Sequence, residues 1–310
     1  MKPHARSLLV CPACHGELAL HRDHEDRGEV LEGRLTCHGC AQAYPIVRGV
    51  PRFVQSGAYA ATFGRQWHWF RTVQLDSCNG TRRSANEFRA TTGWTAADLA
   101  GQRVLDAGVG AGRYAECAAD LGAEVFGVDL TEAVDAAFTN LGRRPNVHLA
   151  QADIFALPFR PATFDRAYSI GVLHHTPDTE LAFARVASAV RPGGQMAVYL
   201  YARYGPGARA SDVIRHVTTR LPARLVLALS TLAIPLYYVY RLPGVGPILR
   251  LALPISPDAH WRWRWLDTFD WYSPRYQWKF LYPEVFRWFR ANGFHDVELF
   301  DGPIRMRGVK

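Results

Sequence analysis

A run of glycines directly after a short apolar segment constrains this chain more than any other feature. Residues 104–112 read Val-Leu-Asp-Ala-Gly-Val-Gly-Ala-Gly. The apolar start predicts a buried strand, and the glycines let backbone approach a nucleotide-containing ligand at the start of the next helix. The spacing is Gly-x-Gly-x-Gly, and Arg113 stands where the dinucleotide fingerprint Gly-x-Gly-x-x-Gly needs its last glycine. The run therefore predicts a nucleotide-type site and disfavours an NAD enzyme.

Short apolar runs alternate with helical stretches beyond this point, which is the pattern of a parallel, doubly wound sheet. The last two apolar runs flank Asp301-Gly302-Pro303, a turn that predicts an antiparallel hairpin. Helices are expected in the gaps, among them 112–121, 179–190 and 283–292. The expected strands are 103–107, 124–129, 147–152, 164–170, 195–201, 297–300 and 304–307.

Two Cys-x2-Cys pairs, 22 residues apart, lie near the N-terminus and comprise Cys11, Cys14, Cys37 and Cys40. Four thiolates in this arrangement suit tetrahedral zinc in a closed, structural site. A redox role is less favoured because the pairs are doubled and no strand-then-helix pattern surrounds them. His15 and His38 are alternative ligands, although we expect both at the surface.

These signals divide the chain into four parts. The fold class expected is α/β: a Rossmann-like seven-stranded sheet with a C-terminal antiparallel hairpin, a small N-terminal zinc ribbon, and a helical, aromatic-rich insert before the last helix. The insert exceeds the loops of about 2 to 6 residues usual in such folds and must hold structure of its own. The expected parts are a zinc-ribbon module at 1–55, an N-terminal lid segment at 56–98, a core at 99–202 and 283–310, and the insert at 203–282.

Three aspartates lie at or near the ends of the first three strands of the core. Asp129 is placed to accept both hydroxyls of a ribose. Asp153 is expected beside an adenine amino group, with apolar neighbours for the face of the base. Asp106, two residues before Gly108, favours a cationic group near the first turn. Together these carboxylates predict a site for a nucleoside that carries positive charge.

At these residues the chain resembles class I S-adenosylmethionine-dependent methyltransferases of the ubiquinone-biosynthesis type. The resemblance covers about 85–202 and 283–310, and it includes Leu-Pro-Phe at 157–159, Phe-Asp at 164–165, Gly-Val-Leu-His-His at 171–175 and Arg-Pro-Gly-Gly at 191–194. It implies S-adenosylmethionine, whose ammonium and sulfonium suit an acidic first turn. The cofactor contacts expected are Asp106, Ala107, Gly108, Gly110, Gly112, Asp129, Leu130, Asp153, Ile154 and Gly171.

The sequence after the second cysteine pair, Tyr-Pro-Ile-Val-Arg-Gly-Val-Pro at 44–51, resembles small zinc-ribbon proteins that activate tRNA and protein methyltransferases. That resemblance implies that the module, with its structural zinc, has a supporting role rather than a catalytic one. A substrate-docking role stays open.

Proton removal from an acceptor needs a positioned base, and two histidines are candidates. His174 and His175 follow the fourth strand, at the sheet edge where ligands bind in open α/β folds. The alternative is that the pair is structural or only lines the cofactor site. Gln66, Trp67 and His68 lie where this family often places a helical lid over the cofactor.

The insert has an apolar half and an aromatic half. Residues 225–240 are uncharged and bracketed by arginines, but they are shorter than the roughly 20 residues of a membrane span and contain Pro235. A buried or interfacial helix is therefore expected. Residues 261–289 hold thirteen aromatic residues, which suit a substrate cap, base stacking, a membrane interface or a sugar platform.

The net charge of +8 favours anionic partners. The function expected is methyl transfer to a small molecule or a glycan or lipid-linked acceptor, at oxygen. Two alternatives remain: an rRNA or tRNA methyltransferase whose ribbon docks RNA, and a non-catalytic cofactor-binding scaffold. Nucleic acid is the less favoured partner, because no Asn-Pro-Pro-Tyr base-flipping motif follows the fourth strand. Only three consecutive apolar residues precede Cys11, too few for the apolar core of a secretory signal, so a cytoplasmic protein is predicted. Peripheral membrane contact through the insert is left open.

Overall fold

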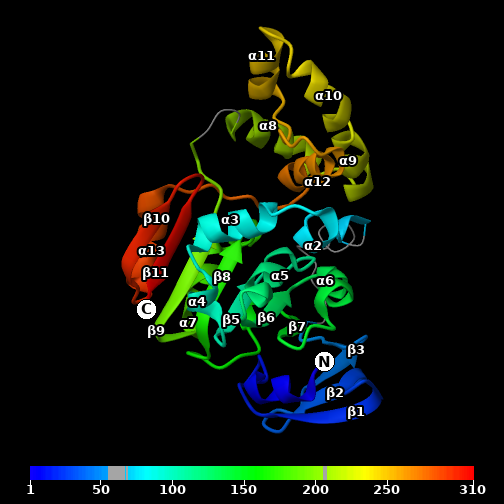
Figure 1. Cartoon of the computed structure of the whole chain (residues 1–310), viewed down its shortest axis with the longest axis vertical. Helices are drawn as coiled ribbons and strands as arrows, with labels where there is room; N and C mark the ends of the chain where they lie inside the picture. The colour runs from blue at the N-terminus through cyan, green and yellow to red at the C-terminus, as the bar shows by residue number, and fades with distance from the viewer. Residues whose placement is uncertain (55–66, 68, 205–207) are drawn as a thin grey trace.

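The computed structural model describes residues 1–54, 67, 69–204 and 208–310. A small N-terminal sheet, a larger central sheet and a group of helices follow one another along the longest axis of the molecule (Figure 1). The N-terminal sheet and the helical group therefore lie at opposite ends.

The part of the chain predicted to be a zinc ribbon forms a four-stranded antiparallel sheet, a detail not predicted from the sequence. A short 3-10 helix, η1 (Pro3–Leu8), precedes it. The strands are β1 (Leu18–Asp26), β2 (Glu29–Cys37), β3 (Ala43–Val47) and β4 (Val50–Pro51).

The central sheet has seven strands in the order β10-β11-β9-β8-β5-β6-β7, which confirms the predicted architecture. Five strands are parallel, and β11 runs antiparallel between β9 and β10. The bounds are β5 (Arg103–Ala107), β6 (Glu124–Asp129), β7 (Val147–Gln151), β8 (Phe164–Ile170), β9 (Val190–Tyr199), β10 (His295–Phe300) and β11 (Arg305–Val309).

The fifth strand begins earlier than its predicted start at residue 195. Val190 already pairs with Phe164, and the register then shifts before Gln195 pairs with Arg166. The Pro-Gly-Gly segment between these pairs, which includes Gly193 at φ 73°, forms the irregularity. Residues that suggest a turn in the sequence therefore lie inside a strand.

Helices cover both faces of the central sheet. The helices α3 (Arg83–Thr92), α5 (Arg113–Asp120) and α6 (Ala133–Leu141) share one buried cluster with Val104 and Val125 of the strands. The helices α7 (Thr179–Ala189) and α13 (Tyr282–Ala291) share the other cluster with Leu105 and the ribbon. The shorter helices are α2 (Asp76–Asn79), α4 (Ala96–Leu99), η2 (Ile154–Ala156) and η3 (Leu173–His175).

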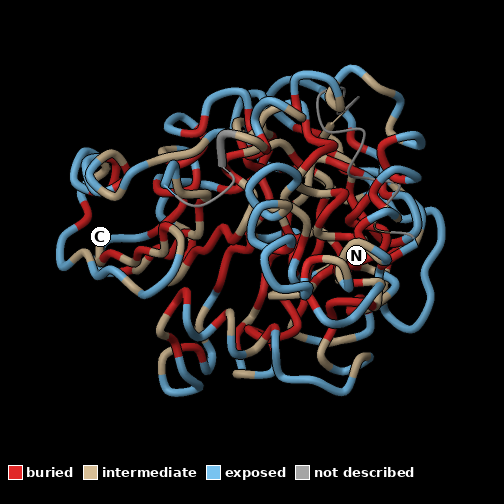
Figure 2. The backbone as a smooth tube through the Cα atoms, turned by 90° about the horizontal axis from the view of Figure 1, so that it is seen from above, coloured by how far each residue is buried: buried red, intermediate tan, exposed pale blue. Residues whose placement is uncertain are grey.

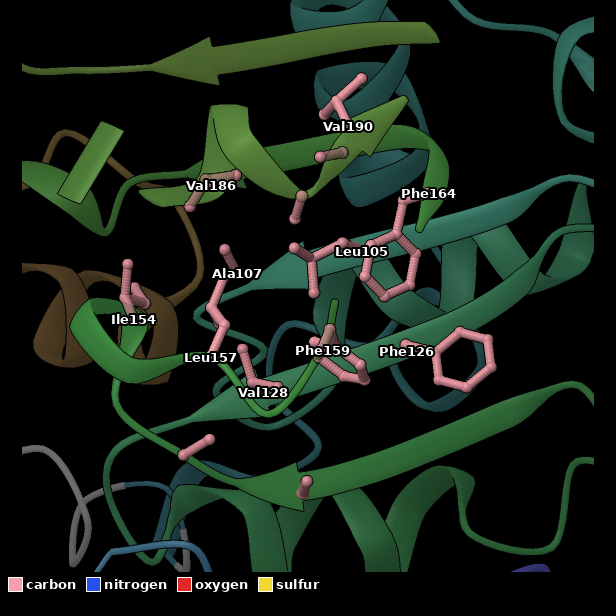
Figure 3. Packing of buried hydrophobic residues seen from close by; sticks show 14 of the residues in the cluster. Leu105, Ala107, Phe126, Val128, Ile154, Leu157, Phe159, Phe164, Val186 and Val190 are labelled. Carbon is pink, nitrogen blue, oxygen red and sulfur yellow. The ribbon is translucent and has the colours of Figure 1, made fainter. Parts of the chain in front are cut away.

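Alternation along the strands explains the two clusters, because successive side chains of a strand point to opposite faces. Leu105 of β5 and Phe126 of β6 lie next to each other in register and pack beside Phe159 and Phe164 (Figure 3). The ring centroids of Phe126 and Phe164 are 5.6 Å apart. Buried residues are concentrated in the interior of the molecule (Figure 2).

The insert, from residue 208 onward, contains five described helices with a core of its own. The last of them, α12, packs against α8, α9 and α10. Its Trp263, Leu266 and Phe269 are buried together with Val226 of α9 and with Phe70 from the segment before the core. The bounds are α8 (Ala208–Thr218), α9 (Ala223–Ser230), α10 (Ala233–Val239), α11 (Val245–Ala252) and α12 (Trp261–Tyr272).

The apolar stretch 225–240 forms parts of two short helices, α9 and α10, rather than the single helix predicted. Val226 and Leu227 are buried, whereas Leu225, Leu229 and Leu232 are exposed. Within the described part of the chain, none of the helices combines the length and the apolar character that crossing a membrane requires.

Candidate active site

A cavity of about 410 Å³ lies where the carboxyl ends of the parallel strands meet the insert. Its inner wall is formed by residues that follow β5, β6, β7 and β8, and its outer wall by side chains of α3 and α12. The predicted residues that line it are Trp67, Gly108, Gly110, Asp129, Leu130, Ile154, Gly171 and His175.

The glycine turn after β5 is shaped by close contacts. Gly108 has φ +99°, and a Cβ atom there would lie 2.4 Å from Cγ1 of Val172, so a larger residue cannot be accommodated without displacement. Gly110, at φ +52°, donates its amide to Oδ2 of Asp129 at 2.9 Å. The turn is thereby tied to the end of the neighbouring strand.

Asp129 ends β6 and is partly buried at the cavity wall. Its Oδ1 accepts hydrogen bonds from the amide and the hydroxyl of Thr131, at 2.9 and 2.7 Å. Burial raises the pKa of Asp129, while these hydrogen bonds and that from Gly110 oppose the rise. These three hydrogen bonds hold the carboxylate at the edge of the cavity, and its predicted contact with ribose stays a prediction.

Four predicted cofactor residues are absent from the cavity lining of the described chain: Asp106, Ala107, Gly112 and Asp153. Their direct cofactor contacts stay predictions. Asp106 is buried, accepts a hydrogen bond from the Tyr168 hydroxyl at 2.8 Å, and has its pKa raised to about 7 by burial. Gly112 is the N-cap of α5, where a Cβ atom would lie 2.6 Å from Leu141.

Asp153 caps η2 by accepting a hydrogen bond from the Phe155 amide at 2.9 Å. The next residue, Ile154, reaches the cavity. Asp153 therefore positions an apolar residue that can contact the face of a base.

The two histidines of η3 have different surroundings. His175 lines the cavity, and its Nδ1 lies 2.8 Å from the carbonyl oxygen of Tyr276. Because a carbonyl only accepts, Nδ1 carries the proton and Nε2 is the basic atom. Burial lowers the pKa of His175 to about 4, so the ring is neutral near pH 7. His174 is buried away from the cavity and stacks on Tyr201 with ring centroids 4.0 Å apart.

Arginine and tryptophan side chains build the outer wall. The Arg83 guanidinium lies 4.1 Å from the ring centroid of Trp263, and that of Arg113 lies 4.9 Å from the same ring. Arg113 also pairs with Glu87 at 2.8 Å, and Arg83 pairs with Asp258 of the insert. These contacts join α3, α5 and α12 around the cavity.

Asp267 is an acidic residue in this aromatic wall. Its carboxylate accepts hydrogen bonds from the Gln74 amide and the Ser256 hydroxyl, each at 3.2 Å. Burial raises the pKa of Asp267 to about 7, and nearby Arg113 opposes that rise. A carboxyl group with this pKa can exchange protons near neutral pH.

Sequence reasoning missed the charged residues of the outer wall. A helical periodicity could have found some of them, because Trp263, Asp267, Asp270 and Trp271 recur at spacings that place them on one face of a helix, and all four line the cavity. Arg83 and Glu87 are likewise four residues apart on α3.

The predicted lid is described only in part. Trp67 lines the cavity, and its indole lies 3.6 Å from the Cβ position of Gly110. Gln66 and His68 lie outside the described residues.

The four predicted zinc ligands, Cys11, Cys14, Cys37 and Cys40, come together, with all their sulfur atoms within 4.8 Å of one another. The Sγ atoms of Cys11 and Cys40 are 3.6 Å apart, and those of Cys14 and Cys37 are 3.4 Å apart. Tetrahedral zinc with bonds of about 2.3 Å places its sulfurs about 3.8 Å apart. Two glycines keep this space open, since a Cβ atom on Gly16 would lie 2.9 Å from Cys37 Sγ and one on Gly39 would lie 3.3 Å from Cys14 Sγ. The cluster fits zinc.

Two family models match separate parts of the chain. Residues 105–198 match the family described as methyltransferase domain, and residues 7–49 match the family described as Trm112p-like protein.

Curated relatives match the core of the chain. An Aromatoleum aromaticum protein named ubiquinone biosynthesis O-methyltransferase is 41% identical over 104 residues, covering 32% of this chain and 44% of the relative. The O-methyltransferase cnsE of Penicillium expansum is 36% identical over 103 residues, covering 32% and 37%. The Caenorhabditis elegans phosphoethanolamine N-methyltransferase 2 is 32% identical over 124 residues, covering 39% and 28%. The chain thus spans less than half the length of these relatives.

Among solved structures, a complex between the Haloferax volcanii Trm112 methyltransferase activator and a putative methyltransferase matches with a TM-score of 0.47 and 14% identity. The match covers 80% of this chain and 96% of that one.

Proposed function

We propose, on the premise that the chain is a class I S-adenosylmethionine-dependent methyltransferase joined to a Trm112-like zinc ribbon, that it methylates an oxygen atom of a small molecule or of a glycan or lipid-linked acceptor. One observation carries the proposal. A single cavity runs from Asp129 and the glycine turn to the polar and aromatic face of α12. Donor and acceptor can therefore occupy adjoining halves of the same space.

The donor half is formed by the strand ends. Asp129 would hold the ribose hydroxyls, Leu130 and Ile154 would contact the adenine, and the backbone from Gly108 to Gly110 would approach the amino acid portion. When bound, S-adenosylmethionine supplies a methyl group activated by its sulfonium. Trp67, next to Gly110, would exclude water from this half.

The acceptor half contains two groups suited to a hydroxyl. The Asp267 carboxylate would take the proton of the hydroxyl, because its pKa of about 7 matches that task near neutral pH. Nε2 of the neutral His175 would accept a hydrogen bond and orient the acceptor oxygen. Trp263 and Trp271 give the space an apolar lining that favours a ring or a chain over a free ion.

Residues of the ribbon are absent from the cavity lining as far as the structure describes it, and the ribbon lies at the far end of the molecule from α12 (Figure 1). Its contacts are with the core instead. The amide of Val10 donates to the Pro158 carbonyl at 2.9 Å, and that of Phe53 donates to the Gln151 carbonyl at 2.8 Å. This arrangement supports a stabilising role for the ribbon rather than direct handling of the acceptor.

Calorimetry with S-adenosylmethionine tests the donor half. We expect binding by the wild type and a loss of at least about tenfold in affinity for Asp129→Ala, because hydrogen bonds to a charged group contribute about 1.5 to 3 kcal/mol. Asp23→Ala changes an exposed carboxylate of β1 and should leave the affinity unchanged. Absence of heat with the wild type would overturn the proposal in favour of a chain that does not bind the cofactor.

Transfer of a labelled methyl group to cell extracts tests the acceptor. Label in a glycan or lipid fraction, in alkali-stable ether linkage, supports the proposal. Label in RNA, with binding that weakens steeply as salt increases, would support an RNA methyltransferase instead.

A further inference from the structure

The far end of the insert exposes apolar side chains in unusual density. We call residues 237–253, the end of α10 with α11 and the turn between them, the α10–α11 tip. Ile248 is 68% exposed and Tyr238 is 65% exposed. The large apolar residues exposed on the tip are Tyr238, Leu242, Val245, Ile248, Leu251 and Leu253. A concentration of this kind on a water-facing surface indicates an interaction site.

The tip is a folded platform. Gly246 faces inward, where a Cβ atom would lie 2.1 Å from the carbonyl oxygen of Tyr240. Arg250 donates to the same carbonyl at 3.2 Å, and the Tyr240 hydroxyl bonds to the Leu253 carbonyl. With this inner side fixed, Val245, Ile248 and Leu251, spaced by three residues, lie on the outer side of α11.

The charged residues of the tip, and of the sequence on either side of it, have one sign. Residues 213–257 contain five arginines and not a single aspartate, glutamate or lysine. Two of these arginines, Arg241 and Arg250, belong to the tip and are exposed, and the guanidinium of Arg241 lies 4.4 Å from the ring centroid of Tyr237. Exposed apolar side chains that share the tip with two arginines and with tyrosine match a bilayer interface that carries negative head groups.

The same charges disfavour a second copy of the chain as the occupant. Two identical tips in contact would bring their arginines together, and residues 213–257 offer no carboxylate to pair with them. An anionic membrane surface removes the repulsion and also takes up the apolar side chains. With only eight residues, α11 is about 12 Å long and can lie in the interface but not cross it.

We infer that the α10–α11 tip docks the protein on anionic phospholipid membranes. Because α9 and α10 pack on α12, which lines the cavity, docking would hold the cavity close to the bilayer. A narrower form of this inference rests on the proposed methyl transfer. In it, the methyl acceptor is an amphiphile that enters the cavity from the membrane.

Co-sedimentation of the full chain with phosphatidylcholine vesicles, with and without phosphatidylglycerol, tests the inference. We expect binding to the anionic vesicles that weakens with salt and with loss of phosphatidylglycerol. Ile248→Asp with Leu251→Asp should reduce it by at least about tenfold, because each substitution replaces an apolar side chain that would enter the interface with a negative charge. The matched control is Leu181→Asp with Leu299→Asp, which adds the same charge at exposed leucines of α7 and β10 and should bind like the wild type.

Equal sedimentation of both double variants with anionic vesicles, or absence of binding by the wild type, would overturn the inference. So would light scattering that shows a wild-type dimer dissociated by the tip substitutions. Calorimetry with S-adenosylmethionine separates this outcome from a failure of the proposed function, since the tip variant should keep the wild-type affinity and melting temperature.

Discussion

The guanidinium of Arg52 lies 2.6 Å from Oδ1 of Asp135, so an ion pair joins the end of the ribbon to α6 beside the central sheet. Both side chains are about nine-tenths buried. Arg52 also donates to the side-chain oxygen of Gln151 at 3.2 Å, at the end of β7. The ribbon is therefore integrated into the core by charge as well as by apolar packing.

Arg52→Ala should lower the free energy of unfolding by about 2 kcal/mol, because it leaves the Asp135 carboxylate buried with a weaker partner. Thermal and urea unfolding measure the change. Arg48→Ala is a matched control, since Arg48 pairs with the same carboxylate at 3.1 Å but is 69% exposed, and exposed pairs contribute about 0 to 1 kcal/mol. Equal destabilisation by both substitutions would contradict this account of the junction.

The cysteine cluster should hold one zinc ion per chain. Elemental analysis should find it in the wild type and not in a variant carrying both Cys11→Ser and Cys14→Ser. Cys78→Ser, which changes an exposed cysteine outside the cluster, should retain the metal. The zinc-free variant should melt at a lower temperature, because the ribbon shares its buried cluster with the central sheet. Purified protein without metal would refute the assignment.

Gly108→Ala should weaken S-adenosylmethionine binding by at least about tenfold, since a Cβ atom would meet Val172 at 2.4 Å and shift the turn. Gly101→Ala is the control. Gly101 also has a positive φ, +71°, but a Cβ atom there meets nothing within 4 Å, so the substitution should affect stability only. Calorimetry distinguishes the two, and wild-type affinity in Gly108→Ala would show that the turn does not approach the cofactor.

The pKa of about 7 at Asp267 predicts a pH dependence of catalysis and of stability. With Asp267 as base, kcat/KM should rise with pH until about 7 and then level off, and Asp267→Asn should lose this limb together with about 10²-fold or more of the rate. The folded state holds this proton more tightly than the unfolded chain does, so the free energy of unfolding should fall as the pH rises from about 4 to about 7. Asp267→Asn should remove its own share of that fall and leave the share of Asp106, whose pKa burial also raises to about 7. A pH profile unchanged by the substitution would exclude Asp267 as the base.

His174 and His175 should respond differently to substitution. His175→Ala should lower kcat about tenfold without removing the limb near pH 7, because it orients the acceptor but is not the base. His174→Phe should retain activity, since the phenyl ring keeps the stack on Tyr201, and neither ring nitrogen of His174 has a hydrogen-bond partner within the described chain. Inactivity of His174→Phe with intact folding would contradict this division of roles.

The parts of the fold predicted best from sequence are those set by local patterns. The strand that ends at Ala107 is an apolar run closed by glycines, and its predicted and observed bounds agree. The cysteine pairs predict their own cluster, because two residues between the cysteines of a pair let both thiolates bind the same metal ion. In both cases the residues that carry the signal are within a few positions of one another.

The outer wall could not be predicted in the same way, because it joins residues distant in sequence. Gln74 and Asp267 are separated by 193 positions, and their hydrogen bond depends on how the insert packs over the core. The sequence also does not distinguish the roles of the adjacent residues His174 and His175. The Trp278 amide donates a hydrogen bond to the His174 carbonyl at 2.9 Å, which holds the 3-10 turn of η3 in place. This turn directs His175 into the cavity and His174 into the core.

The ribbon also covers part of β7, an edge strand of the central sheet. As the last strand in the sheet order, β7 leaves one side without a neighbouring strand of that sheet, and Arg52 and Phe53 meet it at Gln151, where they form a parallel bridge and a backbone hydrogen bond. An uncovered edge strand can pair with the edge of another molecule. If loss of zinc released the ribbon, this edge would become open to aggregation. Bound zinc would then protect the protein from aggregation as well as stabilise its fold.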